Sequence, residues 1–362
     1  MLKSLYNRFF DISDLEISNR HNNFNVIRFF AAVMVIYGHM CSLIGIGQFS
    51  VMKQAVSGLG VKIFFVISGY LITKSFLSDS NALRYSIKRF FRIMPGLAVI
   101  VVLTTFIFGP ILTDLSTKEY FANPETYAYL KNILFHPVYT LPGVFGQNPY
   151  PYAVNGSLWS LPVEVFMYLL MPLTIVIFRK FNIEKIGMIL GFVVSFLLYI
   201  YILKFHNDLV IVVWGNSLVS GLSLVPLFYL GSLFTFKKVR NLLNLQWAVA
   251  IMVILLLFDY SWFKSEILLT FALPYLIFSF ALQSRPVFAK IFSVNDYSYG
   301  LYLYGFLIQQ IIVRKFGVLG LPLNYYFIVS LAVTFVFAVL SWHLVEKPCQ
   351  KFSKNLLKKI NG

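Results

Sequence analysis

The 362-residue chain is short of charged residues. Asp, Glu, Lys and Arg together make up 12% of it, about half of the ~25% that is typical of soluble domains. A water-soluble fold cannot cover its surface with so few charges, so this class of protein is excluded. The residues that are present in excess are apolar: 59% of the chain is hydrophobic, and Phe alone contributes 38 residues. The composition therefore predicts an integral membrane protein.

Cysteine and clustered metal ligands are also scarce. The only two cysteines, Cys41 and Cys349, lie in an apolar run and in a basic tail, so they predict neither a disulfide framework nor a thiolate metal site. The five histidines are scattered, and no pair has the spacing of ligands on one helix face. We therefore expect no metal. The sequence also lacks a Walker-type loop and a GxSxG motif.

Long apolar runs dominate the remainder. About 20 mostly apolar residues cross the ~30 Å hydrocarbon core as a helix, whereas barrel strands would appear as alternating segments of ~10 residues. The sequence predicts an all-α, polytopic helical bundle with about ten transmembrane helices, the seventh of them short. Residues 209–216 either extend the sixth span or form a re-entrant piece. The expected spans are 25–45, 57–77, 90–110, 157–178, 186–204, 217–236, 246–259, 266–283, 298–316 and 324–343.

The net charge of +16 would suggest a nucleic-acid partner for a soluble protein. Here the cations are concentrated in alternate connections, at 74–92, 179–185, 237–240 and 347–359. Cationic loops stay in the cytoplasm, so both termini are predicted to be cytoplasmic, and nucleic acid is not needed to explain the charge. Arg314 and Lys315 do not fit this pattern.

The predicted organisation has three parts in the cytoplasmic (inner) membrane. Residues 1–24 form a cytoplasmic N-terminal segment, 25–343 the transmembrane domain, and 344–362 a basic cytoplasmic tail. The outer segment 111–156 is rich in Pro, Tyr and Asn and is too long for a plain connector, which suggests a lid or substrate loop.

Ionisable residues inside spans are costly and are functional candidates. Arg28 and His39 lie 11 residues apart in the first span, so they share a helix face and are ~16 Å apart along the axis. Glu164 in the fourth span lies at about the depth of His39, and a carboxylate bonded to one ring nitrogen would make the other a general base. The alternatives are a snorkelling Arg28, a His39 bonded to a backbone carbonyl, and a purely structural His39–Glu164 pair.

Two further groups have both a structural and a functional interpretation. Lys88, Arg89 and Arg92 at the start of the third span either enforce topology or bind phosphate, since Arg89 and Arg92 share a helix face. Ser68 and Gly69 in the second span permit close helix packing or the passage of a slender ligand.

Six motifs in order resemble the acyltransferase-3 family of bacterial membrane O-acyltransferases. Two positions depart from the commonest family pattern, because Lys62 replaces a frequent acid and Gly305 a frequent His. The motifs that carry the resemblance are Arg28-x10-His39, Gly60 to Leu71, Arg89-x-x-Arg92-x-x-Pro95, Trp159-Ser160-Leu161-x-Val163-Glu164, Ser298 to Leu303, and Glu346-x-Pro348.

The resemblance implies an O-acyltransferase that moves an acyl group, most often acetyl, from cytoplasmic acetyl-CoA to a sugar hydroxyl. The acceptor would be a cell-surface or lipid-linked glycan such as lipopolysaccharide. His39 would act as general base and Glu164 would orient it. The CoA-binding residues would be Arg28, Lys88, Arg89, Arg92, Ser68 and Gly69, and the acceptor-binding residues Trp159, Ser160 and Asn155.

Direct transfer is favoured over an acyl-enzyme. Cys41 lies about 200° round the helix from His39, and neither Ser68 nor Ser160 has an evident dedicated base. Three alternatives stay open: a succinyl or longer acyl donor, a glycolipid or acyl-group transporter or flippase, and a membrane assembly factor without chemistry.

Overall fold

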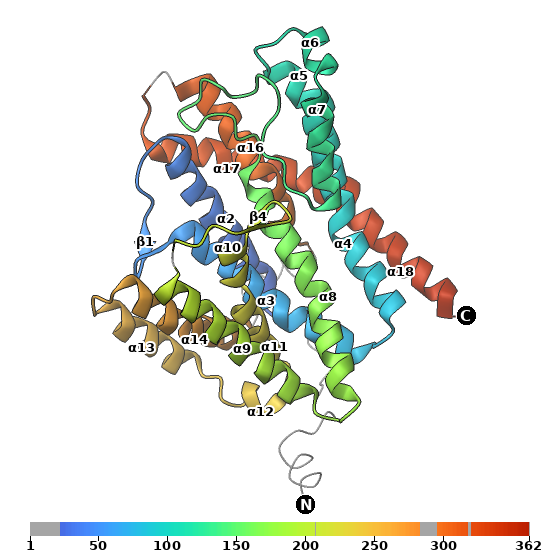
Figure 1. Ribbon diagram of the computed structural model, residues 1–362, viewed down its shortest axis with the longest axis vertical. Coiled ribbons are helices and arrows are strands. Elements are labelled where there is room, and N and C mark those ends of the chain that lie inside the picture. The colour runs from blue at the N-terminus through green and yellow to red at the C-terminus, as the bar shows by residue number, and fades with distance from the viewer. Residues whose placement is uncertain (1–21, 207, 283–294, 318–319, 362) are drawn as a thin grey trace, which may run out of the picture.

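The computed structural model describes residues 22–206, 208–282, 295–317 and 320–361. These residues form a helical bundle with two short antiparallel hairpins (Figure 1). In the first half, the main helices are α2 (Phe24–Leu43), α3 (Val56–Ser78), α4 (Ala82–Leu103), α8 (Ser160–Arg179) and α9 (Glu184–Phe205). In the second half they are α10 (Leu218–Leu222), α11 (Val225–Leu233), α12 (Lys237–Arg240), α13 (Leu245–Leu256), α14 (Trp262–Ala281), α16 (Ser298–Phe316), α17 (Leu323–Ser341) and α18 (Lys347–Asn361).

Seven helical segments are long and apolar enough to cross a membrane, which supports a helical membrane protein. They correspond to predicted spans one to five, eight and ten. The other three predicted spans are also helical. The sixth is divided into α10 and α11 by a break at residues 223–224, the seventh is the 12-residue α13, and the ninth is the largely buried α16. The number of ten crossings stays a prediction.

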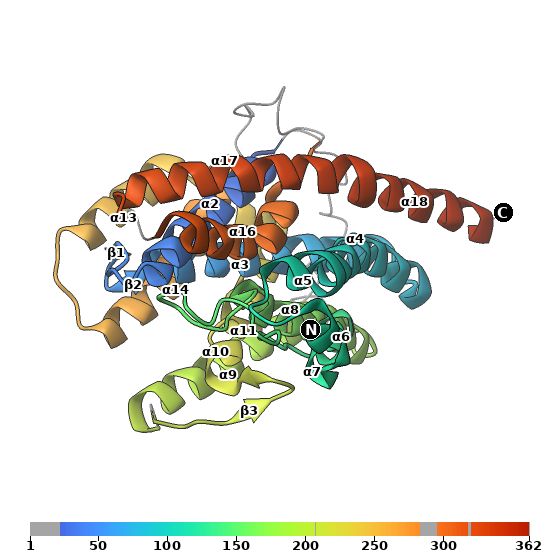
Figure 2. The ribbon, with the colours of Figure 1, turned by 90° about the horizontal axis from the view of Figure 1, so that it is seen from above.

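Helix α3 lies at the centre of the bundle, in contact with both α2 and α11. Two glycines permit its close approach to α11: a Cβ at Gly69 would lie 2.0 Å from the Phe228 carbonyl oxygen, and one at Gly231 would lie 2.1 Å from that of Val66. Small residues let helix backbones approach in this way. Seen from above, α17 and α18 run along one side of the bundle, and α8 and α9 lie on the opposite side (Figure 2).

The segment 111–156, which is predicted to be an outer lid or substrate loop, contains several short helices. Together with the end of the preceding helix they are α5 (Gly109–Leu112), α6 (Thr117–Ala122), α7 (Pro124–Ala128) and the 3-10 helix η3 (Tyr129–Leu134). Its last part, residues 148–155, is tied to α16. Asn148 donates a 2.7 Å hydrogen bond to Gln310, and Gln310 donates to the carbonyl oxygens of Tyr150 and Ala153. Residues 148–155 therefore form a strap that is bound along α16 between Leu303 and Gln310.

The predicted basic tail is a helix. The chain leaves α17 through a π-helical turn, η6 (Trp342–Glu346), and continues as the amphipathic α18, which packs against α4. A second π-helical turn, η2 (Thr104–Phe108), follows α4. Such turns are often found at functional sites, and η6 ends at Glu346, whose carboxylate points back into the bundle toward Arg92.

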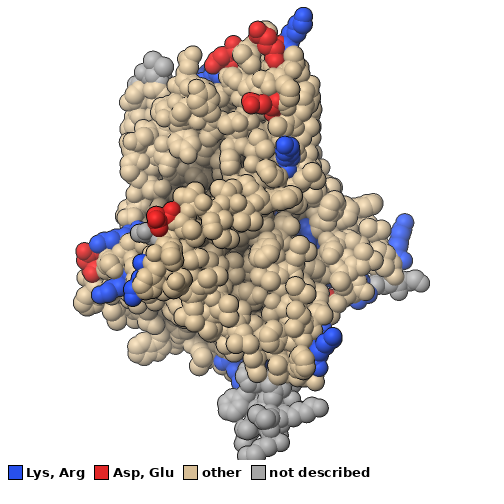
Figure 3. Space-filling model, in the orientation of Figure 1, with Lys and Arg blue, Asp and Glu red and all other residues tan. Residues whose placement is uncertain are grey.

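The remaining strands form the hairpins β1–β2 (Ser50–Val51 and Gln54–Ala55) and β3–β4 (Val212–Val213 and Asn216–Ser217). The second hairpin accounts for residues 209–216, which were expected to extend a span or to re-enter the membrane. It lies beside α8 and α9 on a face that is almost bare of charged side chains (Figure 3).

Candidate active site

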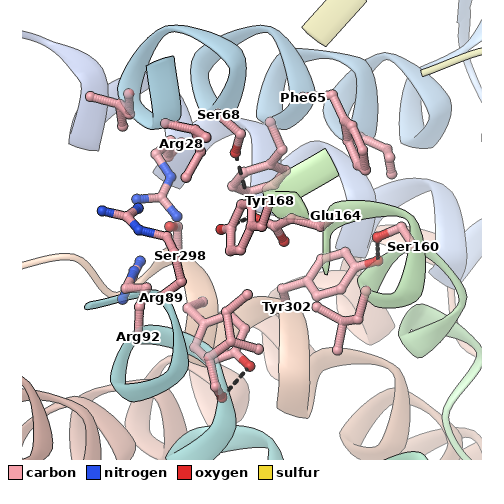
Figure 4. A pocket seen from close by; sticks show the side chains of 17 residues that line it. Arg28, Phe65, Ser68, Arg89, Arg92, Ser160, Glu164, Tyr168, Ser298 and Tyr302 are labelled. Carbon is pink, nitrogen blue, oxygen red and sulfur yellow. Dashed lines mark hydrogen bonds between the residues drawn. The ribbon is translucent and has the colours of Figure 1, made fainter. Parts of the chain in front are cut away.

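A polar pocket lies where α2, α3, α4, α8 and α16 meet, and it contains about 70 Å³ of open space. That open space is small, so only a slender group fits. Figure 4 shows three guanidinium groups at one end of the pocket, Ser160 and Tyr302 at the other, and Glu164 between them. Six of the predicted site residues line it: Arg28, Ser68, Arg89, Arg92, Ser160 and Glu164.

Two of the guanidinium groups are held by buried carboxylates. Arg28 forms an ion pair with Asp296, and Arg92 pairs with Asp296 at 2.6 Å and with Glu346 at 3.4 Å. Burial opposes the ionisation of Asp296, but the charges of Arg28 and Arg92 outweigh burial, so the pKa of Asp296 lies below its ordinary value. Most of the positive charge on Arg28 and Arg92 is therefore balanced within the protein.

Arg89 differs from its two neighbours, because it forms no ion pair within the described parts of the chain. Its Nη2 donates to the Ser75 hydroxyl at 3.2 Å, and its guanidinium lies over the rings of Tyr85 and Tyr168. Its buried Nε has no hydrogen-bond partner. An anion entering this end of the pocket would meet Arg89 as a cation that no carboxylate neutralises.

The carboxylate of Glu164 is held in the middle of the pocket. Tyr168, one helical turn further along α8, donates a 2.6 Å hydrogen bond to Glu164 Oε1, and Ser68 on α3 donates to the same oxygen at 3.4 Å. The predicted hydrogen bond between Glu164 and His39 is not among those formed by the described residues. The reason lies in the packing: α8 contacts α3, and it is Ser68 of α3 that reaches Glu164.

The far end of the pocket is closed by hydroxyl groups. Tyr302 donates its proton to the carbonyl oxygen of Ser157, so the 2.7 Å contact between Ser160 and Tyr302 requires Ser160 to be the donor. The Ser157 carbonyl belongs to the 3-10 helix η4 (Gly156–Trp159), which leads into α8. Ser160 is therefore fixed by Tyr302 rather than paired with a base.

His39 lies just beyond this closed end. Its ring contacts Phe306 edge-to-face, with the ring centroids 5.2 Å apart, and Phe306 follows Tyr302 by one turn of α16. A Cβ at Gly156 would lie 2.8 Å from the Phe306 ring, which places η4 beside the same side chain. His39 does not line the pocket; its ring packs against Phe306, which lies one helical turn from Tyr302 at the closed end.

Gly69 and Lys88, two of the predicted CoA-binding residues, do not line the pocket. Gly69 faces α11 because it follows Ser68 by 100° on the helix. Lys88 is the neighbour of Arg89 on α4 and therefore also points about 100° away from it. Its side chain is directed to Asp79, with which it pairs at 2.9 Å. Hydrogen bonds from Arg84 and Lys88 hold the pKa of Asp79 well below its usual range.

The predicted acceptor residues Asn155 and Trp159 also lie outside the pocket. Asn155 is fully buried, donates to the Leu303 carbonyl at 2.8 Å and accepts from the Ser157 amide, so it caps η4 and joins it to α16. Trp159 is half-buried at the end of η4.

Sequence reasoning missed several groups around the site: Tyr168, Asp296 and the roles of Tyr302 and Glu346. Tyr302 and Glu346 stand in motifs that carried the family resemblance, and this position was the sequence signal that could have identified them. Asp296, just before α16, belongs to no such motif. Glu164 is also not the only acid in an apolar helix. Glu266 is 1% exposed within α14 and pairs with Lys62 at 2.6 Å.

No cluster of three His, Cys, Asp or Glu residues is found in the described part of the chain. The expectation of metal-independent chemistry stays a prediction. The guanidinium groups that line one end of the pocket suit an anionic group of an organic ligand.

Apolar helices that surround a pocket lined by arginines, hydroxyl groups and a carboxylate are the arrangement expected of a membrane-embedded enzyme. The family described as Acyltransferase domain matches residues 21–343, and the chain belongs to this acyltransferase-3 family. It is therefore an acyltransferase, and several of its relatives are named O-acetyltransferases.

Three curated relatives illustrate the range of the family. The chain is 29% identical to the O-acetyl transferase of Shigella phage Sf6, over 91% of this chain and 96% of the relative. It is 26% identical to Nodulation protein 10 of Rhizobium leguminosarum bv. viciae, over 94% and 96%. It is 28% identical to the peptidoglycan O-acetyltransferase OatA of Listeria monocytogenes, over 81% of this chain but 51% of that relative. No solved structure matches the chain.

Proposed function

We propose that the protein transfers an acetyl group from acetyl-CoA to a sugar hydroxyl of a cell-surface or lipid-linked glycan. The observation that carries this proposal is the pocket itself, which leads from three arginines past Glu164 to the hydroxyl groups of Ser160 and Tyr302, and His39 packs on Phe306 one turn further along α16. A donor with an anionic end and a reactive thioester at the other end matches this order of groups. The names of the relatives support acetyl as the acyl group.

The donor phosphates would bind at the end of the pocket that Arg28, Arg89 and Arg92 line. Arg89 is the main phosphate ligand in this proposal, because Arg28 and Arg92 already pair with carboxylates. Lys88 would add a further contact to the phosphates at the edge of the pocket once it has separated from Asp79. The narrow pocket would accept the pantetheine arm past Ser68, with the thioester directed toward Ser160.

The reaction would be a direct transfer with His39 as general base. His39 takes the proton of the sugar hydroxyl while the hydroxyl oxygen attacks the thioester carbonyl, forming the C–O bond. Collapse of the tetrahedral adduct breaks the C–S bond, and the departing CoA thiolate takes the proton back from His39. Glu164 supports this step from within the pocket, through its negative charge, rather than by contact with His39. Opening of the Tyr302–Ser160 closure would join the two sites.

The orientation in the membrane follows from the charge distribution. The connections with most cations would face the cytoplasm together with both termini, and the strap 148–155 would face outward. The acyl donor would then enter from the cytoplasm and the glycan from the outer side of the inner membrane. Trp159 would stack on the sugar at this outer end.

The general-base role is tested with His39→Ala in reconstituted vesicles supplied with radiolabelled acetyl-CoA. Acetyl transfer to the glycan should be lost at normal protein level. The matched control is His206→Ala, which changes an exposed histidine at the end of α9. Undiminished transfer by His39→Ala would disprove the mechanism.

The phosphate site is tested separately by donor affinity. Replacing Arg89 and Arg92 together with Gln should weaken CoA binding by about tenfold or more, because charge-assisted hydrogen bonds contribute ~1.5–3 kcal/mol each. Arg84→Gln on the same helix lies outside the pocket and serves as the control. Unchanged CoA affinity in the double variant would rule out the phosphate site.

Mass spectrometry of the surface glycans with and without the protein identifies the acceptor and the acyl group. An added acetyl mass that accompanies cleavage of the acetyl-CoA thioester is expected. Movement of glycan without thioester cleavage would instead indicate a transporter or flippase, and an added succinyl mass would indicate the other donor.

A further inference from the structure

A large apolar groove lies on the outside of the bundle between α8 and α9. Its volume is about 740 Å³, which is within the range of ~300–1,000 Å³ usual for ligand sites. Hairpin β3–β4, α10 and the end of η3 close it at one end. None of the described residues that line it is charged. The lining residues are Leu134, Phe135, Pro162, Val163, Val165, Phe166, Leu169, Leu170, Gly191, Val194, Ser195, Leu198, Val213, Trp214, Asn216, Ser217, Leu218, Gly221, Leu222, Val225 and Tyr229.

The groove is open toward the surrounding membrane. Both α8 and α9 belong to the segments that are long and apolar enough to span a bilayer. Phe166 and Leu169 on α8 and Val194 and Leu198 on α9 line the groove and are exposed. The same face of the molecule is almost bare of charge in Figure 3. A hydrocarbon chain can therefore enter the groove sideways without leaving an apolar environment.

One end of the groove has the chemistry of a membrane–water interface. Trp214 and Gly215 form the tip of hairpin β3–β4, with φ angles of 51° and 76°, as two-residue hairpin turns require. The turn presents Trp214 over the groove, where its ring contacts His136. Asn216 and Ser217 line the same end. Indole, amide and hydroxyl groups suit a sugar, whereas a phosphate would find no cation among the lining residues.

Helix α8 is the common wall of the groove and the polar pocket. Ser160, Glu164 and Tyr168, spaced four residues apart, face the pocket, whereas Val163 and Phe166 face the groove. Trp159, the last residue of η4, precedes Val163 by four residues and is not itself among the residues that line the groove. A sugar that left the groove at this end would pass Trp159 and then reach Ser160, the adjacent residue, at the pocket.

We propose that this groove binds the hydrocarbon chain of a glycolipid whose sugar is joined to the lipid without a phosphate, and thereby presents that sugar to the pocket as acceptor. The inference rests on the proposed function and specifies its acceptor class. The chain lies between α8 and α9, and the saccharide lies at Trp214 and Trp159. Phospholipid of the bilayer, which carries a phosphate, is the competing occupant.

The test uses a benzophenone amino acid introduced at one of two neighbouring positions of α9. Leu198 lines the groove, whereas Leu197 is 60% exposed and does not. The full chain is reconstituted in vesicles of phosphatidylethanolamine and phosphatidylglycerol that contain radiolabelled dodecyl glucoside. Labelling at position 198 should saturate and be displaced by unlabelled dodecyl glucoside, but not by ethyl glucoside. Labelling at position 197 should rise linearly with probe.

A variant that fills the groove provides the second measurement. Gly221 lines the groove, and a Cβ there would lie 3.4 Å from Val163, an ordinary contact, so Gly221→Phe places a ring in the groove without a clash at Cβ. Saturable labelling at position 198 should disappear in this variant. Equal, unsaturable labelling at positions 197 and 198 would overturn the proposal and identify the groove as a site of bulk lipid.

The proposed function has its own readout in the same vesicles. With acetyl-CoA present, Leu198→Trp should raise the KM for dodecyl glucoside several-fold and leave kcat and the KM for ethyl glucoside unchanged. Leu197→Trp should change none of these values. If the unmodified protein transferred no acetyl group, either the proposed function or the choice of glucoside as acceptor would be wrong. The crosslinking result tests binding in the groove independently of that outcome.

Discussion

The hydroxyl group of Tyr168 donates a 2.6 Å hydrogen bond to Glu164 Oε1 from the next turn of the same helix. Because both residues belong to α8, this bond fixes the carboxylate whatever the neighbouring helices do. Ser68 adds a second, longer bond to the same oxygen from α3. The other oxygen, Oε2, accepts no hydrogen bond from the described residues and is the one available to a ligand.

Removing the Tyr168 hydroxyl should therefore impair turnover more than donor binding. A hydrogen bond to a charged group contributes ~1.5–3 kcal/mol, so we expect Tyr168→Phe to lower kcat for acetyl transfer by about tenfold or more. The KM for acetyl-CoA should change little, because the ring that faces Arg89 remains. Steady-state kinetics in vesicles measure both constants.

Tyr199→Phe is the matched control for this change. It removes another buried tyrosine hydroxyl that donates to a buried glutamate, Glu266 at 3.0 Å, but away from both the pocket and the groove. If both variants lost activity equally, the effect of Tyr168 would be one of general packing. Restoration of kcat by a second donor, as in Tyr168→His, would support the positioning role.

Asp296 is predicted to be a structural requirement of the arginine cluster. Its carboxylate pairs with both Arg28 and Arg92, and breaking a buried ion pair costs ~3–5 kcal/mol because the remaining charge is uncompensated. Asp296→Asn should thus lower the thermal stability of the purified protein strongly, as followed by a fluorescence melting assay. Asp259→Asn, which affects an exposed ion pair with Lys53, should leave the melting temperature almost unchanged.

The same group gives a pH dependence of definite sign. The pKa of Asp296 is lowered in the folded protein, so its contribution to stability is fully present above the unfolded pKa of ~3.9 and is lost as the pH falls through the folded value. The stability difference between Asp296→Asn and the unmodified protein should be constant from neutral pH to about pH 5. It should shrink in stronger acid. A difference that vanished already near pH 6 would contradict the assignment.

The helical fold and the arginine side of the pocket could be predicted because their signals are local. Apolar runs give the long helices, and a helix period places Arg89 and Arg92 on one face. The break within the sixth predicted span was less visible, because Ser223 and Leu224 interrupt the helix inside a largely apolar run. Pro226, in the first turn of α11, supplies a local reason, since proline lacks the backbone N–H that a continuous helix would need.

The partner of Glu164 could not be predicted for a different reason. Position along a span gives the depth of Glu164 and His39 but not which helices are neighbours, and equal depth is therefore compatible with separation across the bundle. In the structure, α3 contacts both α2 and α8. Asp296 likewise reaches Arg28 across 268 residues of sequence, a relation that no local pattern encodes.

Lys62, which departs from the family pattern, is predicted to depend on Glu266. Both side chains are buried, and Lys62 Nζ lies 2.6 Å from each oxygen of the Glu266 carboxylate. Lys62→Glu would bury two like charges and should reduce the amount of folded protein and its melting temperature. The expected loss is ~3–5 kcal/mol, as for other broken buried pairs.

The exchange variant Lys62→Glu with Glu266→Lys keeps one charge of each sign. It should recover a large part of the melting temperature lost by the single variant, and Tyr199, which donates to Glu266 at 3.0 Å, limits full recovery. The four proteins form a double-mutant cycle. A purely additive result would mean that the two charges do not stabilise each other.

Lys88 is held by Asp79 in the structure, and releasing it tests its proposed contact with the donor. Asp79→Asn removes the carboxylate that pairs with Lys88 at 2.9 Å and with Arg84 at 2.6 Å. If Lys88 then reaches the donor phosphates, the KM for acetyl-CoA should fall by about two- to fivefold, the range expected for a partly exposed ion pair of ~0.5–1 kcal/mol. Because such a pair is screened by salt, the gain should shrink as ionic strength rises.

Arg84→Gln leaves the pair between Lys88 and Asp79 intact and should not alter the KM. An unchanged KM in Asp79→Asn, at low salt, would assign Lys88 to anchoring the start of α4 and leave Arg89 as the main phosphate ligand.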